Sequence, residues 1–342
     1  MPHYSSSVSS SREDDTATPL IDNFSRRITY LRLSVTDRCD LRCRYCCPES
    51  GIPLVPHDQI LTYEEFERLV GIFASLGVSK VRLTGGEPFA RRGLLDFVKK
   101  LKAIQGVRHL FLTTNGVQAG KYLDTLIEAG VDGINLSLDT LDAARYKMIT
   151  RRDRLPDVLR TLYGAIERNI PVKVNSVVTD DTRDEELVTL VGLSVDNPIT
   201  VRFIEQMPFS GADRIVQHDN GSLLERLRAL LPPMTEVKAS TPSTSRVFTL
   251  PGYRGSVGII EGNSRHFCKT CNKVRVTATG MLKTCLYDNG SLDLRQLLRS
   301  GCDDSDIAAE IIDSVQKSSA DGHTAETASR RVSEPSMAGI GG

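Results

Sequence analysis

The sequence has little that would mark a membrane, secreted or nucleic-acid-binding protein. Its 342 residues carry 43 basic and 43 acidic side chains, so the formal net charge is zero and no overall field favours nucleic acid or a membrane. It contains no apolar run of membrane-spanning length and no apolar signal-peptide centre. Residues 1–18 are rich in Ser and charge, which predicts a disordered tail. We therefore expect a cytoplasmic protein.

Cysteine is missing from the middle of the chain. All eight cysteines fall into two groups, and more than two hundred residues without a cysteine separate them. A secreted disulfide protein would usually be shorter and would spread its cysteines more evenly. Clustered thiols in a cytosolic chain indicate bound metal instead.

Short apolar runs rich in β-branched residues alternate with amphipathic stretches through residues 19–232. Strands are expected at 31–36, 80–84, 109–113, 133–138, 172–178 and 199–205. Helices are expected at 62–77, where Thr62 and Glu65 form a capping box, and at 91–105, 120–129, 155–169, 183–195 and 223–231. Six strand–helix units predict a parallel sheet with right-handed crossovers. Periodicity alone fits either a doubly wound sheet or a full or partial barrel.

The strand–helix alternation ends at about residue 232, and the sequence pattern changes there. Short β-like runs at 245–250 and 256–260 precede helices expected at 291–300 and 303–316. Residues 233–316 therefore form a second, α+β region, and residues 317–342 read as a polar tail that ends in Gly341-Gly342.

The first cysteine set, Cys39, Cys43 and Cys46, has the spacing C-x3-C-x2-C on a loop after a strand. Three thiolates on one loop can hold a [4Fe–4S] cluster, and three ligands leave one iron open for substrate. Cys47 is read as a spare thiol. The alternatives are a zinc site that lacks one ligand, or buried thiols.

The second cysteine set, Cys268, Cys271 and Cys285, has the spacing C-x2-C-x13-C. Structural zinc takes four ligands, and His266 or Cys302 could supply the fourth. A zinc site therefore stays open as an alternative to a second iron–sulfur cluster.

The first set, together with Gly85-Gly86-Glu87-Pro88 after the next strand, resembles the radical S-adenosylmethionine (SAM) superfamily. The resemblance implies a partial TIM-type barrel of about six βα units, with the cluster's open iron chelated by SAM. The residues that it places around SAM are Tyr45, Gly86, Glu87, Ser137 and Met207.

Within that superfamily, the chain from about residue 19 onward resembles the GTP 3′,8-cyclase family, also called molybdenum cofactor biosynthesis protein A. The motifs are Asp22-Asn-Phe-Ser-Arg26, residues 30–37, 112–116, 202–205 and 267–275, and the terminal Gly341-Gly342. In that family the second cysteine set holds a [4Fe–4S] cluster that contacts GTP, and the terminal glycines enter the active site.

The same resemblance assigns the GTP contacts and the catalytic residues. The GTP set is Arg32, Arg82, Thr113, Lys173, Arg202, Lys273, Val274 and Arg275. The catalytic set is Arg32, Lys273, Arg275, Gly341 and Gly342. Arginine suits a triphosphate because its planar guanidinium group can donate two parallel hydrogen bonds, as a fork, to phosphate oxygens. Lys273 stands where relatives usually have Arg, which keeps the charge but loses the fork, and Cys47 is a second departure.

The resemblance implies that SAM is cleaved to a 5′-deoxyadenosyl radical that abstracts H3′ of GTP. The product would be (8S)-3′,8-cyclo-7,8-dihydroguanosine 5′-triphosphate, at the start of molybdenum cofactor biosynthesis. The resemblance also implies partners: a flavodoxin- or ferredoxin-like electron donor, a downstream cyclic pyranopterin monophosphate synthase and a possible homodimer. The alternatives are another two-cluster radical SAM enzyme, such as a peptide-modifying maturase, or an iron–sulfur electron carrier.

Overall fold

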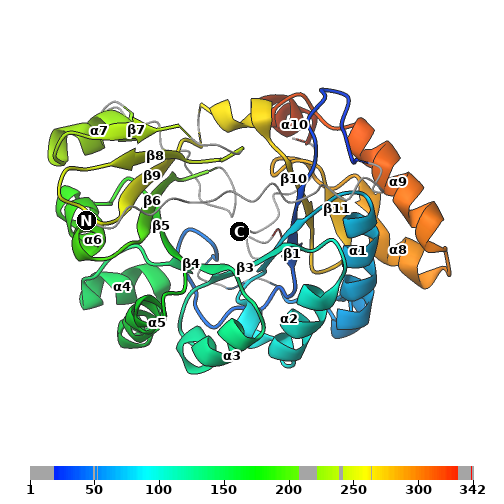
Figure 1. Cartoon of the computed structure of the whole chain (residues 1–342), viewed down its shortest axis with the longest axis horizontal. Coiled ribbons are helices and arrows are strands. Elements are labelled where there is room, and N and C mark those ends of the chain that lie inside the picture. The colour runs from blue at the N-terminus through cyan, green and yellow to red at the C-terminus, as the bar shows by residue number, and fades with distance from the viewer. Residues whose placement is uncertain are drawn as a thin grey trace, which may run out of the picture.

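The structure is a computed structural model that describes residues 19–48, 51, 53–207, 222–238, 242–262, 264–329 and 340. Its centre is a sheet of parallel strands curved into an incomplete barrel, with helices along the outside (Figure 1). Six parallel strands follow one another in the sheet: β1 (Tyr30–Ser34), β2 (Lys80–Thr84), β3 (His109–Thr114), β4 (Gly133–Ser137), β5 (Val172–Val178) and β6 (Thr200–Glu205). The predicted partial barrel is confirmed.

Helices connect these strands and cover the outer face of the barrel (Figure 1). They are α1 (Tyr63–Ser75), α2 (Leu94–Ala103), α3 (Leu123–Glu128), α4 (Ala143–Thr150), α5 (Leu155–Glu167), α6 (Asp184–Asp196) and α7 (Leu223–Leu230). The capping box predicted at the start of α1 is present, with Thr62 and Glu65 each bonded to the other's backbone N–H. Helix α4 was not predicted, because its short sequence has little amphipathic character.

The alternation of side chains along each strand separates an apolar outer layer from a polar interior. Leu31 and Leu33 of β1 are fully buried in the same core cluster as Phe66 and Phe73 of α1. Arg32 lies between the two leucines and, because successive side chains of a strand point to opposite faces, it points into the barrel. The strands thus present their charged residues to the interior.

The C-terminal region extends both edges of the barrel. On one side β10 (Lys273–Val276) pairs parallel to β1 and continues into the antiparallel strands β11 (Met281–Lys283) and β12 (Leu292–Asp293). On the other side β9 (Ser256–Ile260) pairs parallel to β6 and is followed by β8 (Arg246–Thr249) and β7 (Thr235–Val237). The sequence order of these strands therefore differs from their order in the sheet.

Three helices complete the C-terminal region: α8 (Leu294–Arg299), α9 (Asp304–Gln316) and α10 (Gly322–Ser329). Helix α10 lies in the segment read from sequence as a polar tail, and its Gly322 and Ala325 are buried. No helix in the described ranges has the length and apolar character needed to cross a membrane.

Candidate functional site

The first cysteine set lies on the loop after β1 and is folded into a tight turn. The N–H groups of Cys46 and Cys47 both donate to the Cys43 carbonyl at 2.9 Å. The amide of Asn115, which follows β3, donates to the Cys39 sulfur at 3.7 Å. These contacts fix the backbone of the loop at the end of the barrel.

The C-terminal end of α4 anchors this loop from the side. The N–H of Arg42 donates to the Thr150 carbonyl at 3.0 Å. Arg151 then uses one guanidinium nitrogen to reach the carbonyls of Arg42 and Cys47 at 3.0 and 2.9 Å. The helix missed from sequence is therefore a support of the cysteine loop.

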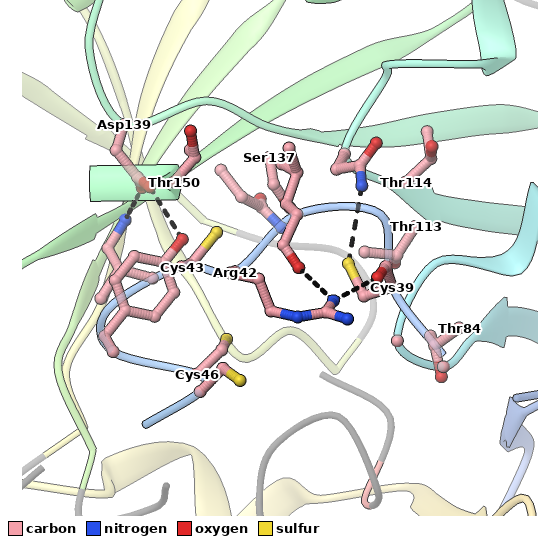
Figure 2. Close-up of a pocket in the computed structure, with 18 of the residues that line it drawn as sticks. Cys39, Arg42, Cys43, Cys46, Thr84, Thr113, Thr114, Ser137, Asp139 and Thr150 are labelled. Carbon is pink, nitrogen blue, oxygen red and sulfur yellow. Dashed lines mark hydrogen bonds between the residues drawn. The ribbon is translucent and has the colours of Figure 1, made fainter. Parts of the chain in front are cut away.

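One cavity joins the cysteine loop to the C-terminal ends of the barrel strands (Figure 2). Its lining includes Cys39, Cys43, Cys46, Tyr45, Gly86, Thr113, Ser137 and Met207. The structure thus gathers the first cysteine set, one predicted GTP contact and all but one of the predicted SAM contacts around one opening. Carboxyl ends of parallel strands are where barrel proteins place their active sites.

Burial makes the free thiolates of this cavity unfavourable. It raises the pKa of Cys39 to about 11 and that of Cys46 to about 12, and the charge of Cys39 adds to the shift of Cys46. Within the described part of the chain, no three His, Cys, Asp or Glu side chains converge on a single ion, but the three cysteines of the first set line one cavity. Three partly buried thiols that line one opening suit an iron–sulfur cluster, whose irons offset the thiolate charge.

The two glycines after β2 allow close contact with the cysteine loop. A Cβ on Gly86 would lie 2.2 Å from the Arg38 carbonyl oxygen, and one on Gly85 would lie 2.6 Å from that of Thr36. The Gly86 N–H donates to the Thr36 carbonyl at 2.8 Å, and the Glu87 N–H donates to the Arg38 carbonyl at 2.7 Å. Gly86 also lines the cavity, so it serves both the loop and the predicted SAM position.

Glu87 differs from its neighbours because it is not among the residues that line the cavity. Its side chain is buried and accepts hydrogen bonds from the Thr114 hydroxyl at 2.8 Å and the Asn115 N–H at 2.7 Å. Burial raises the pKa of Glu87 to about 7. In this structure Glu87 braces the turn after β3, whose Asn115 in turn reaches Cys39.

Tyr45 is held by a residue that sequence reasoning missed. Its hydroxyl donates to Asp139 at 2.7 Å, and the other carboxylate oxygen of Asp139 accepts from the Val177 N–H at 2.8 Å. Burial raises the pKa of Asp139 to about 6. This buried carboxylate ties the cysteine loop to β5 and fixes Tyr45, one of the predicted SAM contacts. Its only sequence signal is its place just after β4.

Below the cavity, basic side chains line the interior of the barrel at neighbouring register positions. Arg32 of β1 pairs with Arg275 of β10 on one side and with Arg82 of β2 on the other. We call the whole group the cation layer: Arg32, Lys80, Arg82, Lys173, Arg202, Lys273 and Arg275. Six of its seven members were predicted as GTP contacts, and Lys80 was not.

The members of the cation layer lie near enough to perturb one another. Burial lowers the pKa of Arg32 to about 9, and the charges of Arg275, Arg82 and Arg202 add to that shift. Burial also lowers the pKa of Lys173 to about 8, with Arg202 as the next cause. Positive charge concentrated in a partly desolvated interior is costly unless an anion balances it.

Tyr30 belongs to the same environment and was also missed. Burial by itself would raise its pKa, but Arg82, Arg32 and Lys80 lower it to about 7. Its hydroxyl accepts a hydrogen bond from Arg82 Nε. The signal in the sequence is the two-residue spacing from Arg32, which places both side chains on the interior face of β1.

Two buried polar atoms in this region have no hydrogen-bond partner among the described residues: Arg275 Nη1 and Thr113 Oγ1. Buried donors are normally satisfied, so these atoms suit an anionic, oxygen-rich ligand. Val274, which the resemblance placed with the GTP contacts, has its side chain in the apolar core. Only its backbone can face such a ligand.

The second cysteine set lies next to the cation layer. Cys268 lies in a 3-10 turn, His266–Thr270, Cys271 follows it, and Cys285 comes after β11. Burial raises the pKa of Cys285 to about 11, and the charges of Asp288, Cys271 and Cys268 add to the shift. These three thiols are therefore neighbours and suit a second cluster.

Electrostatic contact links the second set to the predicted ligand position. The charges of Cys271 and Cys285 partly offset the desolvation that lowers the pKa of Arg275. Cys302 lies apart on the turn between α8 and α9, where its sulfur is 3.3 Å from the Ser300 hydroxyl. The His266 side chain, Gly341 and Gly342 lie outside what the structure describes. Ile340 is described and is buried against Tyr287 and Ala325.

Comparison with known proteins gives two matches that together cover most of the chain. The model of the radical SAM superfamily matches residues 33–193, and that of molybdenum cofactor synthesis C matches residues 199–324. The fold and the first cysteine set therefore define a radical SAM protein, a class that uses SAM and a [4Fe–4S] cluster.

Curated relatives narrow the class. The GTP 3′,8-cyclase of Heliobacterium modesticaldum is 42% identical over 84% of this chain and 90% of its own length, and that of Alkaliphilus metalliredigens is 41% identical over 94% and 99%. The chain belongs to the GTP 3′,8-cyclase family. Molybdenum cofactor biosynthesis protein 1 of Bos taurus is 42% identical, but this chain spans only about half of its length (46%).

Solved structures agree on the fold. The crystal structure of Streptococcus suis SuiB aligns with a TM-score of 0.59 at 15% identity, over 87% of this chain and 72% of that one. At this identity the likeness concerns the barrel alone.

Proposed function

We propose that this chain catalyses the GTP 3′,8-cyclase reaction, which converts GTP to (8S)-3′,8-cyclo-7,8-dihydroguanosine 5′-triphosphate for molybdenum cofactor biosynthesis. The observation that carries the proposal is the partly buried cation layer between two cysteine sets. Thr113 lines the cavity of the first set, and Arg275 lies within electrostatic reach of the second. A nucleoside triphosphate held there would lie between both cofactors.

Each of the two cysteine sets would hold one cluster. The first cysteine set would hold one [4Fe–4S] cluster, with SAM against Tyr45, Gly86, Ser137 and Met207, and the second set would hold another. When bound, the first cluster and SAM supply the one-electron chemistry that generates a carbon-centred radical. The protein's share is to orient both ligands and to keep water from the reacting atoms.

The cation layer has the chemistry to bind the triphosphate. Arg32, Arg82 and Arg202 present planar guanidinium groups, which suit phosphate oxygens. Lys173 and Lys273 add point charges, and Arg275 offers a buried N–H group with no partner among the described residues. We further propose that Arg32, Lys273, Arg275 and the terminal Gly341-Gly342 complete the catalytic centre.

The direct test is anaerobic reconstitution with iron, sulfide, SAM, a chemical reductant and GTP, followed by mass analysis of the nucleotides. We expect 5′-deoxyadenosine and a cyclised nucleotide of unchanged mass that differs from GTP in retention. A matched control carries alanine at the first cysteine set and should form neither product. SAM cleavage without consumption of GTP would contradict the proposed substrate. Absence of SAM cleavage from fully reconstituted protein would favour an electron carrier.

The reaction also requires partners. We propose a one-electron donor of the flavodoxin or ferredoxin type, because the one-electron chemistry that the first cluster and SAM would supply needs an external source of electrons. We propose that a cyclic pyranopterin monophosphate synthase consumes the product. A homodimer and a cytoplasmic location complete the proposal, and we expect no nucleic-acid or membrane partner.

A further inference from the structure

The segment before β1 forms a small turn built around one buried carboxylate. Asp22 Oδ1 accepts hydrogen bonds from the N–H groups of Phe24 and Arg26, both at 2.9 Å, and Oδ2 accepts from Arg26 Nε at 2.6 Å. The Asp22 side chain is only 1% exposed. The turn therefore fixes the direction of the Arg26 guanidinium.

That guanidinium connects two segments that are far from it in sequence. Arg26 Nη1 donates to the carbonyl of Cys268 at 3.0 Å and to that of Ala320 at 2.9 Å. Arg26 Nη2 donates to the Ser319 carbonyl at 2.8 Å. One side chain thus holds a cysteine of the second set beside the residues that lead into α10.

Helix α10 begins against the sulfur of the same cysteine. The Gly322 N–H donates a hydrogen bond to Cys268 Sγ, which opposes the effect of burial on the pKa of that thiol. The contact requires glycine, because a Cβ on Gly322 would lie 2.7 Å from the Tyr287 ring. Arg265, whose guanidinium lies 3.6 Å from the centre of that ring, pairs with Glu326 of α10 at 2.7 Å.

We propose that Arg26 is a positioning residue for the second cluster. It fastens the Cys268 loop to the start of α10, so that the Gly322 N–H stays on the Cys268 sulfur. The expected effect of Arg26 on GTP cyclisation rests on the proposed function. N–H donation to a ligand sulfur raises the reduction potential of an iron–sulfur cluster, so Arg26 also tunes that potential.

The test measures the second cluster on its own. In a background with alanine at the first cysteine set, the holoprotein holds only the second cluster, and its electron paramagnetic resonance spectrum and reduction potential can be recorded. We expect Arg26→Gln to retain the iron of this cluster, to shift its spectrum and to lower its potential. Amide exchange at the start of α10 should become faster. Arg26→Lys, which keeps one donor group, should give intermediate values.

Activity is then measured in the otherwise unchanged chain. Arg26→Gln should keep SAM cleavage near the unsubstituted rate while GTP cyclisation falls roughly 10–100-fold, as for partners of metal ligands. Gly322→Ala, which displaces α10 but keeps Arg26, should give the same pattern. Arg160→Gln is the matched control, because Arg160 lies exposed on α5 and pairs with Asp157.

Three results would overturn the inference. The first is an unchanged spectrum and potential in Arg26→Gln. The second is an equal loss of SAM cleavage and GTP cyclisation, which would mean general destabilisation. The third is loss of the second cluster from Gly322→Ala and both Arg26 variants. If the unsubstituted chain does not cyclise GTP, the proposed function fails, while the spectrum and the amide exchange still decide the role of Arg26.

Discussion

Substitution of Gly86 by alanine tests whether the close approach of the β2 turn controls the first cluster. The new Cβ would lie 2.2 Å from the Arg38 carbonyl oxygen and 2.5 Å from its carbon. Ordinary contact begins at 3.4 Å, so the cysteine loop has to move by about 1 Å, a displacement that can cost about 100-fold in rate.

The same change affects the fold less than the chemistry. Overpacking typically costs about 1–3 kcal/mol, and the hydrogen bond from the Glu87 N–H to the Arg38 carbonyl is lost as the loop moves. We therefore expect folded protein with an altered first-cluster spectrum and SAM cleavage reduced about 100-fold.

The assay follows 5′-deoxyadenosine formation, iron content and thermal unfolding in parallel. Gly192→Ala on α6 is the control, because a Cβ there meets no atom within 4 Å and alanine favours a helix. A Gly86→Ala protein that cleaves SAM at the unsubstituted rate would refute the reasoning.

The remaining predictions concern cluster content, division of labour, the C-terminus and pH. Reconstituted protein should hold about eight iron from two four-iron clusters; saturation at about four with one tightly bound zinc would contradict this. Alanine at the second cysteine set should leave slow SAM cleavage but abolish GTP cyclisation, and normal cyclisation would be the opposing result. Deletion of Gly341-Gly342 should spare both clusters and SAM cleavage while cyclisation collapses, and product analysis checks this. GTP affinity measured by calorimetry should weaken as pH rises through the Lys173 pKa of about 8, because the free ammonium is charged below that pH and neutral above it. Lys173→Arg should flatten this dependence, and an equally steep profile would exclude Lys173 as its source.

The barrel was predictable because its strands are short apolar runs of uniform character. Residues 80–84 and 172–178 were expected as strands and form β2 and β5 with those bounds. The supports of the site were harder to predict from sequence, since α4 has little amphipathic character and its function depends on carbonyl positions. Asp139 and Tyr30 acquire their roles from burial and neighbouring charges, which only the folded chain creates.

The C-terminal region shows a different limit of sequence reasoning. Residues 317–342 read as a polar tail, yet α10 packs through Gly322 and Ala325. Small residues carry little apolar signal, but they allow close approach of the backbone. Here that approach brings a backbone N–H to the Cys268 sulfur, a contact that no pattern of side-chain types encodes.

The pairing of β1 with β10 has a consequence for how the chain is made. Tyr30 and Lys273 are register partners, so until the ribosome has delivered β10, β1 exposes an unpaired edge that can recruit another chain. The first cysteine loop emerges early, whereas its partner strand and the second cysteine set emerge late. Cluster loading during synthesis would thus proceed in two stages, with a window in which a half-built, aggregation-prone barrel depends on chaperones.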